Sequence, residues 1–386
     1  MPEAVIVSAA RTAVGTAYKG TLANTTVEEL GTAIVAETVR RSGLDPRLFD
    51  DVILADPGTV ARYAAIECGL LNVPGQSIGR YCAGSLAAVG NASAAVKAGM
   101  DRAIVAGGVF SASTSPRMSR RRLGTRDEWE DYSPALNPLS EQAPTFDMSV
   151  LVGHNTATEA GISRAEMDAW ALRSHRRAIA AIDEGTFADE IVPVKATGWD
   201  GSTVLFAVDE HPRRDTTMEK LAALRVLHPE IDGFQITAGN ASGVNDAASA
   251  VAITSGDLAA AEGLTSMATV RAWAAVGVHP GRTGFGAVDA IRRVLDRAGC
   301  SVADIALWEI NEAFASVPVA ACRELGIDDA LVNIHGSGCS IGHPISASGT
   351  RMISTLTYAL RRRGGGLGVA AMCAAAGQGG AVLIEA

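Results

Sequence analysis

The sequence predicts an α/β protein made of two similar halves around a layered core. Short apolar, β-branched segments alternate with segments of helical spacing, which is typical of helices packed on a largely parallel sheet. Hydrophobic residues make up 48% of the 386 residues, glycine occurs 41 times, and aromatic residues make up only 5%. Such small side chains let helices and sheets approach one another closely. Each half also contains a small-residue helix entered through a glycine-containing turn, which indicates a repeated unit.

The first half contains alternating strands and helices. Thr26 is a plausible N-cap for the first helix because two glutamates follow it in the first turn. The helix after Cys82 is apolar nearly all round and is therefore expected to be buried. The expected strands are 4–9, 52–55 and 103–106, and the expected helices are 26–42, 63–70 and the segment after Cys82.

The middle of the chain changes character near Ser111. Residues 111–147 are rich in Ser, Arg, Pro, Asp and Glu, and a loop of this length is usually functional or a small subdomain. Ser163 and Glu166 form a capping-box pattern that predicts a helix over 163–182. We interpret 111–236 as an insertion that covers one mouth of the core.

The second half repeats the pattern of the first. The turn Gly342-His343-Pro344 leads into the small-residue helix of the second half, just as the segment around Cys82 leads into that of the first half. Such doubling is able to build one site between two similar sheets. The expected strands are 268–276, 304–310 and 331–334, with further apolar runs at 367–371 and 381–384, and the expected helices are 287–297, 316–325 and 346–360.

Composition excludes several classes of function. The net charge of −9 argues against general nucleic-acid binding, and no apolar run reaches the roughly 20 residues that span a bilayer. No secretory signal is visible, no C-x-x-C pair occurs, and the seven histidines are scattered, so we expect no metal site and a cytoplasmic protein with reduced thiols. A near match to a dinucleotide fingerprint at 336–342 has the wrong spacing.

One basic cluster stands out in this acidic chain. Two interpretations remain open for it: a solvated loop, or a site for a phosphorylated ligand, because guanidinium groups bind phosphate in a bidentate way. The cluster consists of Arg117, Arg120, Arg121, Arg122 and Arg126.

Four segments carry residues suited to catalysis. Cys82 at the first turn of a helix is a candidate nucleophile, because helix N-termini favour the thiolate, although most such cysteines are inert. Asn311 after a strand can hold a water or donate to an oxyanion, or can simply form a turn. His343 is either a base or a satisfied turn histidine. Cys373, ahead of a glycine-rich tail, is on its own more typical of a structural residue.

Taken together, these segments resemble the thiolase family, the CoA-dependent 3-ketoacyl thiolases and acetyl-CoA acetyltransferases. The resemblance covers essentially the whole chain. Its most specific elements are Asn-Glu-Ala-Phe at 311–314 and Gly-His-Pro at 342–344, in that order. It also includes Val5–Thr12, the Cys82 helix, the small-residue segment 237–243 and Cys373.

The resemblance implies a role for each residue. Cys82 takes the acyl group as a thioester, His343 activates it and helps to bind the thioester oxygen, and Asn311 holds a water in that first oxyanion hole. Cys373 moves a proton on the substrate α-carbon or on the CoA thiol. The backbone N–H groups of Cys82 and Ala375 form a second oxyanion hole. The residues expected to contact substrate or CoA are Met148, Arg225, Ala241, Ser242 and Phe314.

The resemblance also implies an architecture and an activity. The expected fold is a five-layered α-β-α-β-α sandwich, with 1–115 and 237–262 forming the N-terminal half, 116–236 a loop domain over CoA, and 263–386 the C-terminal half. The expected activity is thiolytic cleavage of 3-ketoacyl-CoA or the reverse Claisen condensation, in fatty acid or lipid metabolism. We expect acyl-CoA and CoA as substrates, no tightly bound cofactor, and a homodimer or homotetramer.

Several positions depart from the family pattern. Gly84-Ser85 inverts the usual Ser-Gly after the nucleophile, and Gly79 replaces an Asn. Ala375 adds a methyl group where the family has Gly. His-Met-Gly is replaced by Asp-Met-Ser at 147–149, and Thr283 replaces a pocket Met. These changes leave open two alternatives: acyl transfer to a non-CoA acceptor within a complex, and a non-catalytic subunit.

Overall fold

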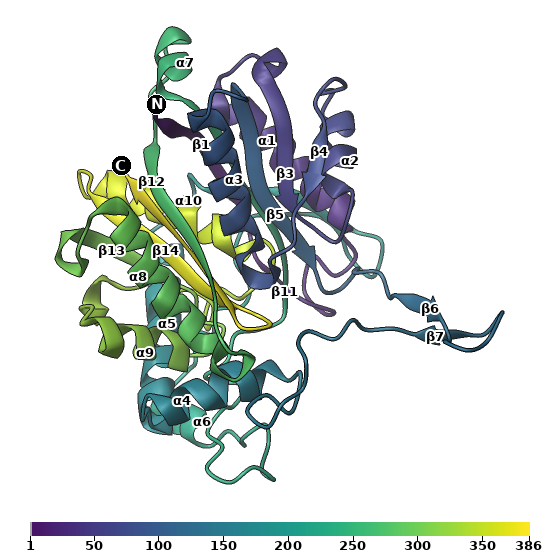
Figure 1. Cartoon of the computed structure of the whole chain (residues 1–386), viewed down its shortest axis with the longest axis vertical. Helices are drawn as coiled ribbons and strands as arrows, with labels where there is room; N and C mark the ends of the chain where they lie inside the picture. Colours follow the sequence, from purple (N-terminus) through teal and green to yellow (C-terminus); the bar gives the residue numbers. More distant parts are fainter. Residues whose placement is uncertain (1) are drawn as a thin grey trace.

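The computed structural model describes residues 2–386, and its core is one long mixed sheet made of two half-sheets (Figure 1). The half-sheets join only where β1 meets β12, through the pairs Val5–Thr269 and Ile6–Ala268. The N-terminal half-sheet contains, in order, β1 (Ala4–Thr12), β11 (Asn245–Ser255), β5 (Ala103–Ser111), β3 (Phe49–Ala55) and β4 (Gly75–Ser77). The C-terminal half-sheet contains β12 (Ala268–Gly277), β15 (Gln378–Glu385), β14 (Leu367–Ala374) and β13 (Ile305–Ile310).

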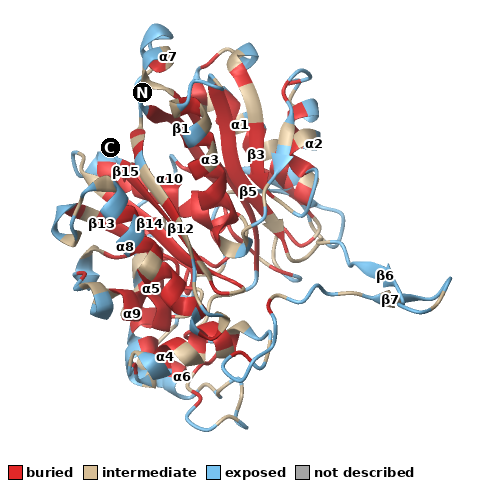
Figure 2. Cartoon of the chain, viewed as in Figure 1, coloured by how far each residue is buried: buried red, intermediate tan, exposed pale blue. Residues whose placement is uncertain are grey.

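Helices form the three remaining layers. α3 (Gly84–Lys97) and α10 (Ser348–Arg362) lie between the half-sheets and contact strands of both. α1 (Val27–Ser42) and α2 (Val60–Glu67) cover the outer face of the N-terminal half-sheet. α8 (Gly286–Ala298) and α9 (Ser316–Leu325) cover that of the C-terminal half-sheet. The predicted five-layered sandwich is confirmed, and Figure 2 shows the central helices buried within it.

Small side chains make the central layer possible. Ten of the fourteen residues of α3 are buried, so no face of it is left for solvent-exposed charge except near its C-terminal end. A Cβ at Gly349 of α10 would lie 2.7 Å from the Ser85 hydroxyl and 2.8 Å from Leu86 of α3. The two central helices therefore pack at a distance that only glycine allows at this position.

The predicted helix starts are largely confirmed. Both capping boxes form, at Thr26 with Glu29 and at Ser163 with Glu166, the latter opening α5 (Arg164–Asp183). The helix expected over 63–70 instead spans α2 and begins earlier. Asp56 causes the shift, because its carboxylate accepts a hydrogen bond from the Ala61 N–H at 3.0 Å and so caps the chain ahead of the predicted start.

The segment between β5 and β11 holds several small elements. The β6–β7 hairpin projects away from the body of the molecule (Figure 1). β8 (Ile191–Val192) pairs with β1 in the main sheet. Outside this segment, β2 (Gly15–Thr16) pairs with β11. The small elements of the segment are β6 (Ser119–Arg121), β7 (Trp129–Asp131), a π-helix (Ser149–His154), α4 (Asn155–Glu159), β8 (Ile191–Val192), β9 (Val194–Thr197), β10 (Thr203–Phe206) and α6 (Met218–Ala222). The remaining elements are β2 (Gly15–Thr16), α7 (Gly256–Ala261) and 3₁₀ turns at Pro46–Leu48, Tyr81–Ala83, Pro280–Phe285, Val302–Asp304 and Asp329–Leu331.

One predicted strand is wrong. Residues 331–334 form no strand; Val332 makes a single bridge to Trp308, and Asn333 has φ +52°. The Asn333 side chain instead takes the place of a strand backbone, accepting from the Ile310 N–H and donating to the Ile310 carbonyl, both at 2.8 Å. The segment is thereby fixed across the end of β13 as a loop.

Candidate active site

Cys82 lies in the 3₁₀ turn that leads directly into α3. Tyr81, the residue before it, has φ +44°, a left-handed conformation that is uncommon for a residue with a side chain. This strained residue turns the chain sharply between β4 and α3. The turn places the Cys82 thiol in the wall of a cavity that is partly open to the surface.

The cavity has a volume of about 260 Å³ and brings together residues from both halves. Cys82, His343, Cys373 and Ala375 all line it, as the sequence predicted. Met148, Ser242 and Phe314, predicted as substrate contacts, line it too. The other lining residues, which the sequence did not single out, are Phe110, Val152, Gly243, Val244, Ala313, Ile345 and Ala374.

Burial keeps both cavity thiols protonated. It raises the pKa of Cys82 to about 11, although the backbone N–H groups of Ala375 and of Cys82 itself hydrogen-bond the sulfur and oppose the rise. Burial, together with the nearby Cys82, raises the pKa of Cys373 still further above its usual range. A thiolate is the reactive form of cysteine, so Cys82 needs a base close at hand.

His343 is suited to be that base. Its backbone N–H donates to Asn245 Oδ1 at 2.9 Å, and Ser348 Oγ lies 2.6 Å from its Nδ1. Because the Ser348 hydroxyl donates its only hydrogen to the Pro344 carbonyl at 3.0 Å, it must accept from Nδ1–H. This fixes the tautomer in which Nε2 is unprotonated and keeps its lone pair. Burial, reinforced by the positive charge of Arg351, lowers the pKa of His343 to about 3, so the ring is neutral at pH 7.

A glycine is required just before this histidine. Gly342 has φ +112°, a conformation that side-chain-bearing residues rarely adopt. A Cβ there would also lie 2.5 Å from the side chain of Asn245, which anchors the His343 backbone. The glycine of the Gly-His-Pro sequence is thus explained by local geometry.

Asn311 lies behind the cavity rather than in its wall. It follows β13, and its Nδ2 is 3.4 Å from both ring nitrogens of His343. Its Oδ1 is buried and has no hydrogen-bond partner among residues 2–386. Asn311 therefore lies beside His343 without lining the cavity itself, and its predicted role of holding a water stays a prediction.

Two predicted contact residues lie outside the cavity wall. Ala241 forms a bridge with Phe314 and so supports a lining residue without lining the cavity. Arg225 is exposed and is not among the lining residues. Its predicted contact with the nucleotide of CoA stays a prediction.

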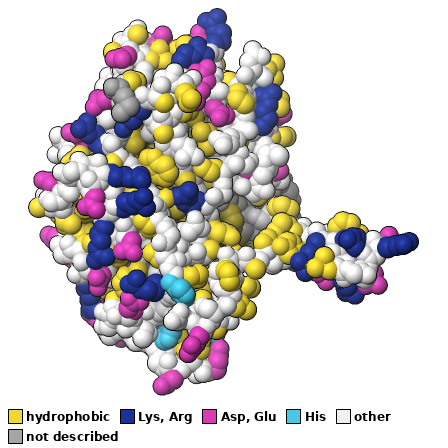
Figure 3. All heavy atoms as spheres, viewed as in Figure 1, with side chains coloured by type: hydrophobic (Ala, Val, Ile, Leu, Met, Phe, Trp, Pro, Cys, Tyr) yellow, Lys and Arg dark blue, Asp and Glu magenta, His cyan; other side chains and the backbone are white. Residues whose placement is uncertain are grey.

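The basic cluster also lies away from the cavity. Its arginines belong to the projecting β6–β7 hairpin and its approach, and none of them lines the cavity. Arg120 pairs with Glu130 at 2.9 Å and Arg122 with Glu128 at 2.7 Å, so part of its charge is already neutralised. Figure 3 shows this arm carrying both basic and apolar side chains.

The inverted Gly84-Ser85 pair has a steric explanation. A Cβ at position 84 would lie 2.6 Å from the Cβ of Ala55 at the end of β3. Ser85 is fully buried, and its hydroxyl accepts from the Thr350 N–H at 3.1 Å, which ties α3 to α10. The inversion thus fits the neighbours that this chain places around the nucleophile helix.

The other departures surround the site. Ala375 sits in the turn between β14 and β15, and its methyl group borders the cavity. Asp147 lies just before the π-helix. Its Oδ2 is 3.0 Å from Nε2 of His228, and its Oδ1 accepts a hydrogen bond from the Ser149 N–H at 2.7 Å. Thr283 accepts from the Gly377 N–H at 3.1 Å and so braces the same turn that holds Ala375.

Comparison with known proteins gives matches along the whole chain. The thiolase N-terminal domain matches residues 4–257 and the thiolase C-terminal domain matches residues 264–386. Acetyl-CoA acetyltransferase of Pseudomonas aeruginosa is 39% identical over 394 residues, with 100% of this chain and 99% of that protein covered. The 3-ketoacyl-CoA thiolase of Bacillus subtilis is 39% identical with both chains fully covered. Beta-ketoadipyl-CoA thiolase of Pseudomonas knackmussii is also 39% identical, with 99% of each chain covered.

A solved structure supports the same assignment. The crystal structure of the Bacillus anthracis acetyl-CoA acetyltransferase has a TM-score of 0.92 and 36% identity, covering 100% of this chain and 99% of that chain. The fold and the full-length matches define an acyltransferase that uses CoA thioesters. More narrowly, the chain belongs to the thiolase family.

Two structural absences complete the description. Among residues 2–386, no helix has the length and apolar character needed to cross a membrane. Within the same range, no group of three or more His, Cys, Asp or Glu side chains is arranged to hold a metal ion.

Proposed function

We propose that this chain cleaves 3-ketoacyl-CoA thiolytically, and runs the reverse Claisen condensation, through a thioester on Cys82. The observation that carries the proposal is the convergence of Cys82, Cys373 and a neutral His343 on one apolar cavity. The Ala375 N–H, which opposes the rise in the pKa of Cys82, is available as an oxyanion donor at the same place. A thiol, a base, a second thiol and a backbone donor are the groups that this reaction needs.

The first half-reaction forms the acyl-enzyme. His343 Nε2 takes the Cys82 proton, and the sulfur attacks the ketone carbon of the substrate. The bond between that carbon and the α-carbon breaks, and the Cys373 thiol gives its proton to the α-carbon, which releases acetyl-CoA and leaves the shortened acyl group on Cys82. Splitting acyl transfer at a covalent intermediate gives ping-pong kinetics.

The second half-reaction returns the enzyme to its starting state. The thiolate of Cys373 takes the proton of the incoming CoA thiol, and the CoA sulfur attacks the thioester on Cys82. Cys82 leaves as a thiolate and regains its proton from His343. Every proton taken in the first half-reaction is thus returned in the second.

Two donor sets would stabilise the oxygens that become negative. The N–H groups of Cys82 and Ala375 face the oxygen of the tetrahedral intermediate. His343, with a water held by Asn311, faces the thioester oxygen of the substrate as its α-carbon becomes a carbanion. One preorganised donor of this type contributes about 3–4 kcal/mol to transition-state stabilisation.

We further propose that the acyl group is short and uncharged, with acetoacetyl-CoA as the reference substrate. Most of the cavity wall is apolar, and no Lys or Arg among residues 2–386 lines it. A carboxylate at the end of the acyl chain would be buried without a cation, which costs several kcal/mol. An uncharged acyl group would distinguish the substrate of this chain from that of its relatives named for beta-ketoadipyl-CoA.

Steady-state kinetics test the proposal. Thiolysis of acetoacetyl-CoA should follow ping-pong kinetics, and it should be lost in Cys82→Ala and Cys373→Ala variants whose folding is intact. Acylation of Cys82 without turnover in the presence of CoA would instead favour the alternative, transfer to a non-CoA acceptor. The methyl group of Ala375 at the cavity wall is the observation that keeps this alternative in view.

The assembly and location of the protein are proposed on other grounds. We propose a homodimer or homotetramer, because Met118, Leu123 and Trp129 expose apolar side chains on an arm that its own chain does not cover. On such an arm, the hairpin arginines would reach bound CoA only in a neighbouring subunit. All six cysteines are free, which favours the cytoplasm, and 116–236 remains the proposed CoA-covering domain.

A further inference from the structure

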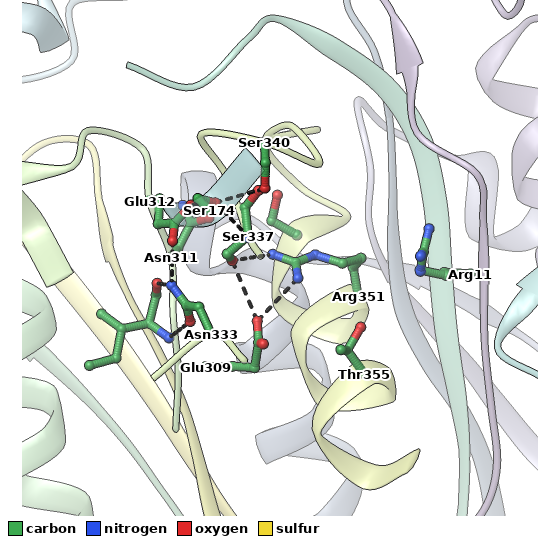
Figure 4. Close-up of polar contacts among 12 residues, drawn as sticks. Arg11, Ser174, Glu309, Asn311, Glu312, Asn333, Ser337, Ser340, Arg351 and Thr355 are labelled. Atoms are coloured by element: carbon green, nitrogen blue, oxygen red, sulfur yellow. Dashed lines mark hydrogen bonds and ion pairs between the residues drawn. The ribbon is translucent and has the colours of Figure 1, made fainter. Parts of the chain in front are cut away.

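A buried carboxylate next to Asn311 joins the two loops that build the catalytic site (Figure 4). Glu312 is 1% exposed and is the second residue after the end of β13. Its Oε1 accepts from Trp170 Nε1 at 2.9 Å and from Asn333 Nδ2 at 2.8 Å. Its Oε2 accepts from Ser174 Oγ at 2.6 Å and from the Cys339 N–H at 3.0 Å.

These four donors use the full capacity of the carboxylate. An ionised carboxyl group has about four lone-pair sites and donates nothing. Glu312 therefore fits its surroundings only as an acceptor at both oxygens. The proposed mechanism gives Glu312 no chemical role, since it lines no part of the cavity.

The four donors come from two elements near the site, α5 and the loop that leads to His343. Trp170 and Ser174 belong to α5, which lies outside the two half-sheets. Asn333 and Cys339 belong to the loop that leads to His343, and Cys339 is only four residues before it. Glu312 thus connects this loop to the strand end that carries Asn311.

The same loop is pressed against the backbone of Glu312. A Cβ at Gly338 would lie 2.6 Å from the Glu312 carbonyl oxygen and 3.2 Å from Asn311 Oδ1. A second anchor holds the loop from the other side, where Ser337 Oγ accepts from Arg351 Nη2 of α10 at 2.8 Å. Loop and strand end therefore have little freedom to move apart while these contacts persist.

From this arrangement we infer that Glu312 is a positioning residue for catalysis. Its carboxylate sets the 3.4 Å separation between the Asn311 amide and the His343 ring, and so aligns the base with the first oxyanion hole. The inference rests on the proposed roles of Asn311 and His343. It adds a residue whose effect on the reaction passes entirely through them.

The variant Glu312→Gln tests this role with little change of volume. Its amide NH₂ faces two donors in either orientation, so two of the four hydrogen bonds are lost and the loop shifts. We expect kcat for acetoacetyl-CoA thiolysis to fall at least tenfold. KM should stay within about twofold, because the cavity wall is unchanged.

Glu190→Gln is the matched control. Glu190 is also a buried carboxylate, which accepts from Arg11 at 2.6 Å and from Thr355 at 3.1 Å, but none of these residues lines the cavity. We expect a loss of thermal stability with kcat per folded molecule unchanged. Equal kcat values for the two variants would overturn the positioning role. Trp170→Phe removes a single donor and keeps the ring, and should show a smaller kcat loss if Glu312→Gln fails to fold.

A measurement independent of turnover separates this inference from the proposed function. Alkylation of Cys82 by iodoacetamide near pH 7 depends on His343 as base, so it should slow at least severalfold in Glu312→Gln. The rates of variant and wild type should converge above about pH 11, where the thiol ionises without help. Equal rates at both pH values would refute the positioning role, whereas a wild-type enzyme without thiolase activity would refute only the proposed function.

Discussion

Adding one methyl group at Gly84 should disturb both the stability and the chemistry of the protein. In Gly84→Ala the new Cβ would lie 2.6 Å from the Cβ of Ala55, about 1 Å closer than ordinary carbon–carbon contact. Both atoms sit on backbone that is packed in the core, so neither moves away easily. Overpacking of this kind costs about 1–3 kcal/mol in the free energy of unfolding.

The structure also indicates which second substitution should relieve this clash. Among residues 2–386, and leaving aside the chain neighbours and the helix's own backbone, Ala55 alone has an atom within 3.4 Å of the added Cβ, so Ala55→Gly should remove the clash. Alone, Ala55→Gly costs roughly 1–2 kcal/mol, from a lost buried methyl group and the flexibility of glycine in a strand. The double variant should therefore be more stable than the sum of the single changes predicts, by about 1–2 kcal/mol.

Urea unfolding of the four proteins measures this coupling directly. The rate of Cys82 acylation should follow the same pattern, because Gly84 is two residues from the nucleophile and a displacement near 1 Å costs about 100-fold. Additive free energies, or a Gly84→Ala protein as stable as wild type, would refute the steric account of the Gly84-Ser85 inversion.

Three further outcomes are expected. Ser348→Ala leaves the His343 Nδ1–H buried without an acceptor, which costs about 1–3 kcal/mol, so kcat should fall roughly 5- to 150-fold; an unchanged kcat would contradict the tautomer assignment. Burial lowers the pKa of His343 to about 3 and that of His175 to about 4. Below about pH 6.5, these two histidines therefore bind protons in the unfolded chain but stay neutral in the folded protein. The free energy of unfolding should then drop as the pH falls from about 6.5 toward 4, and a flat urea-unfolding profile there would contradict this. Finally, kcat/KM for 3-oxohexanoyl-CoA should exceed that for 3-oxoadipyl-CoA at least 100-fold, because only the latter buries a carboxylate; similar values would require an unseen cation.

Local sequence patterns were sufficient for the elements that depend on local physics. The N-cap predicted at Thr26 and the capping box predicted at Ser163 both form, because the interacting residues lie within one helical turn. The buried helix after Cys82 follows from its lack of a polar face. Cys82, His343 and Cys373 come together because each lies beside a turn that its own motif dictates.

Elements decided by tertiary contacts could not be predicted in this way. β11 is rich in Ala and Ser, which do not favour strands, and it forms because β1 and β5 pair with it on both sides. Residues 331–334 have a strand-like composition, but the side chain of Asn333 replaces the backbone pairing.

Some site residues were missed for a similar reason. Phe110 and Val152 line the cavity, but an apolar residue in a chain so rich in apolar residues gives no separate signal. Ser348 shows its role only through the geometry of two hydrogen bonds. The prediction for Arg225 rests on motif position alone, and the structure leaves this residue exposed and outside the cavity wall.

Intact-protein mass after incubation with acetoacetyl-CoA tests the central claim most directly. The measurement compares wild type with Cys82→Ala and Cys373→Ala, without added CoA. The account predicts an acetyl adduct on wild type that is absent from Cys82→Ala and forms slowly on Cys373→Ala, whose α-carbon acid is missing. An adduct that persists in Cys82→Ala, or no adduct on wild type with any acyl-CoA or 3-ketoacyl-CoA donor, would contradict the role of Cys82 as the acyl-carrying nucleophile.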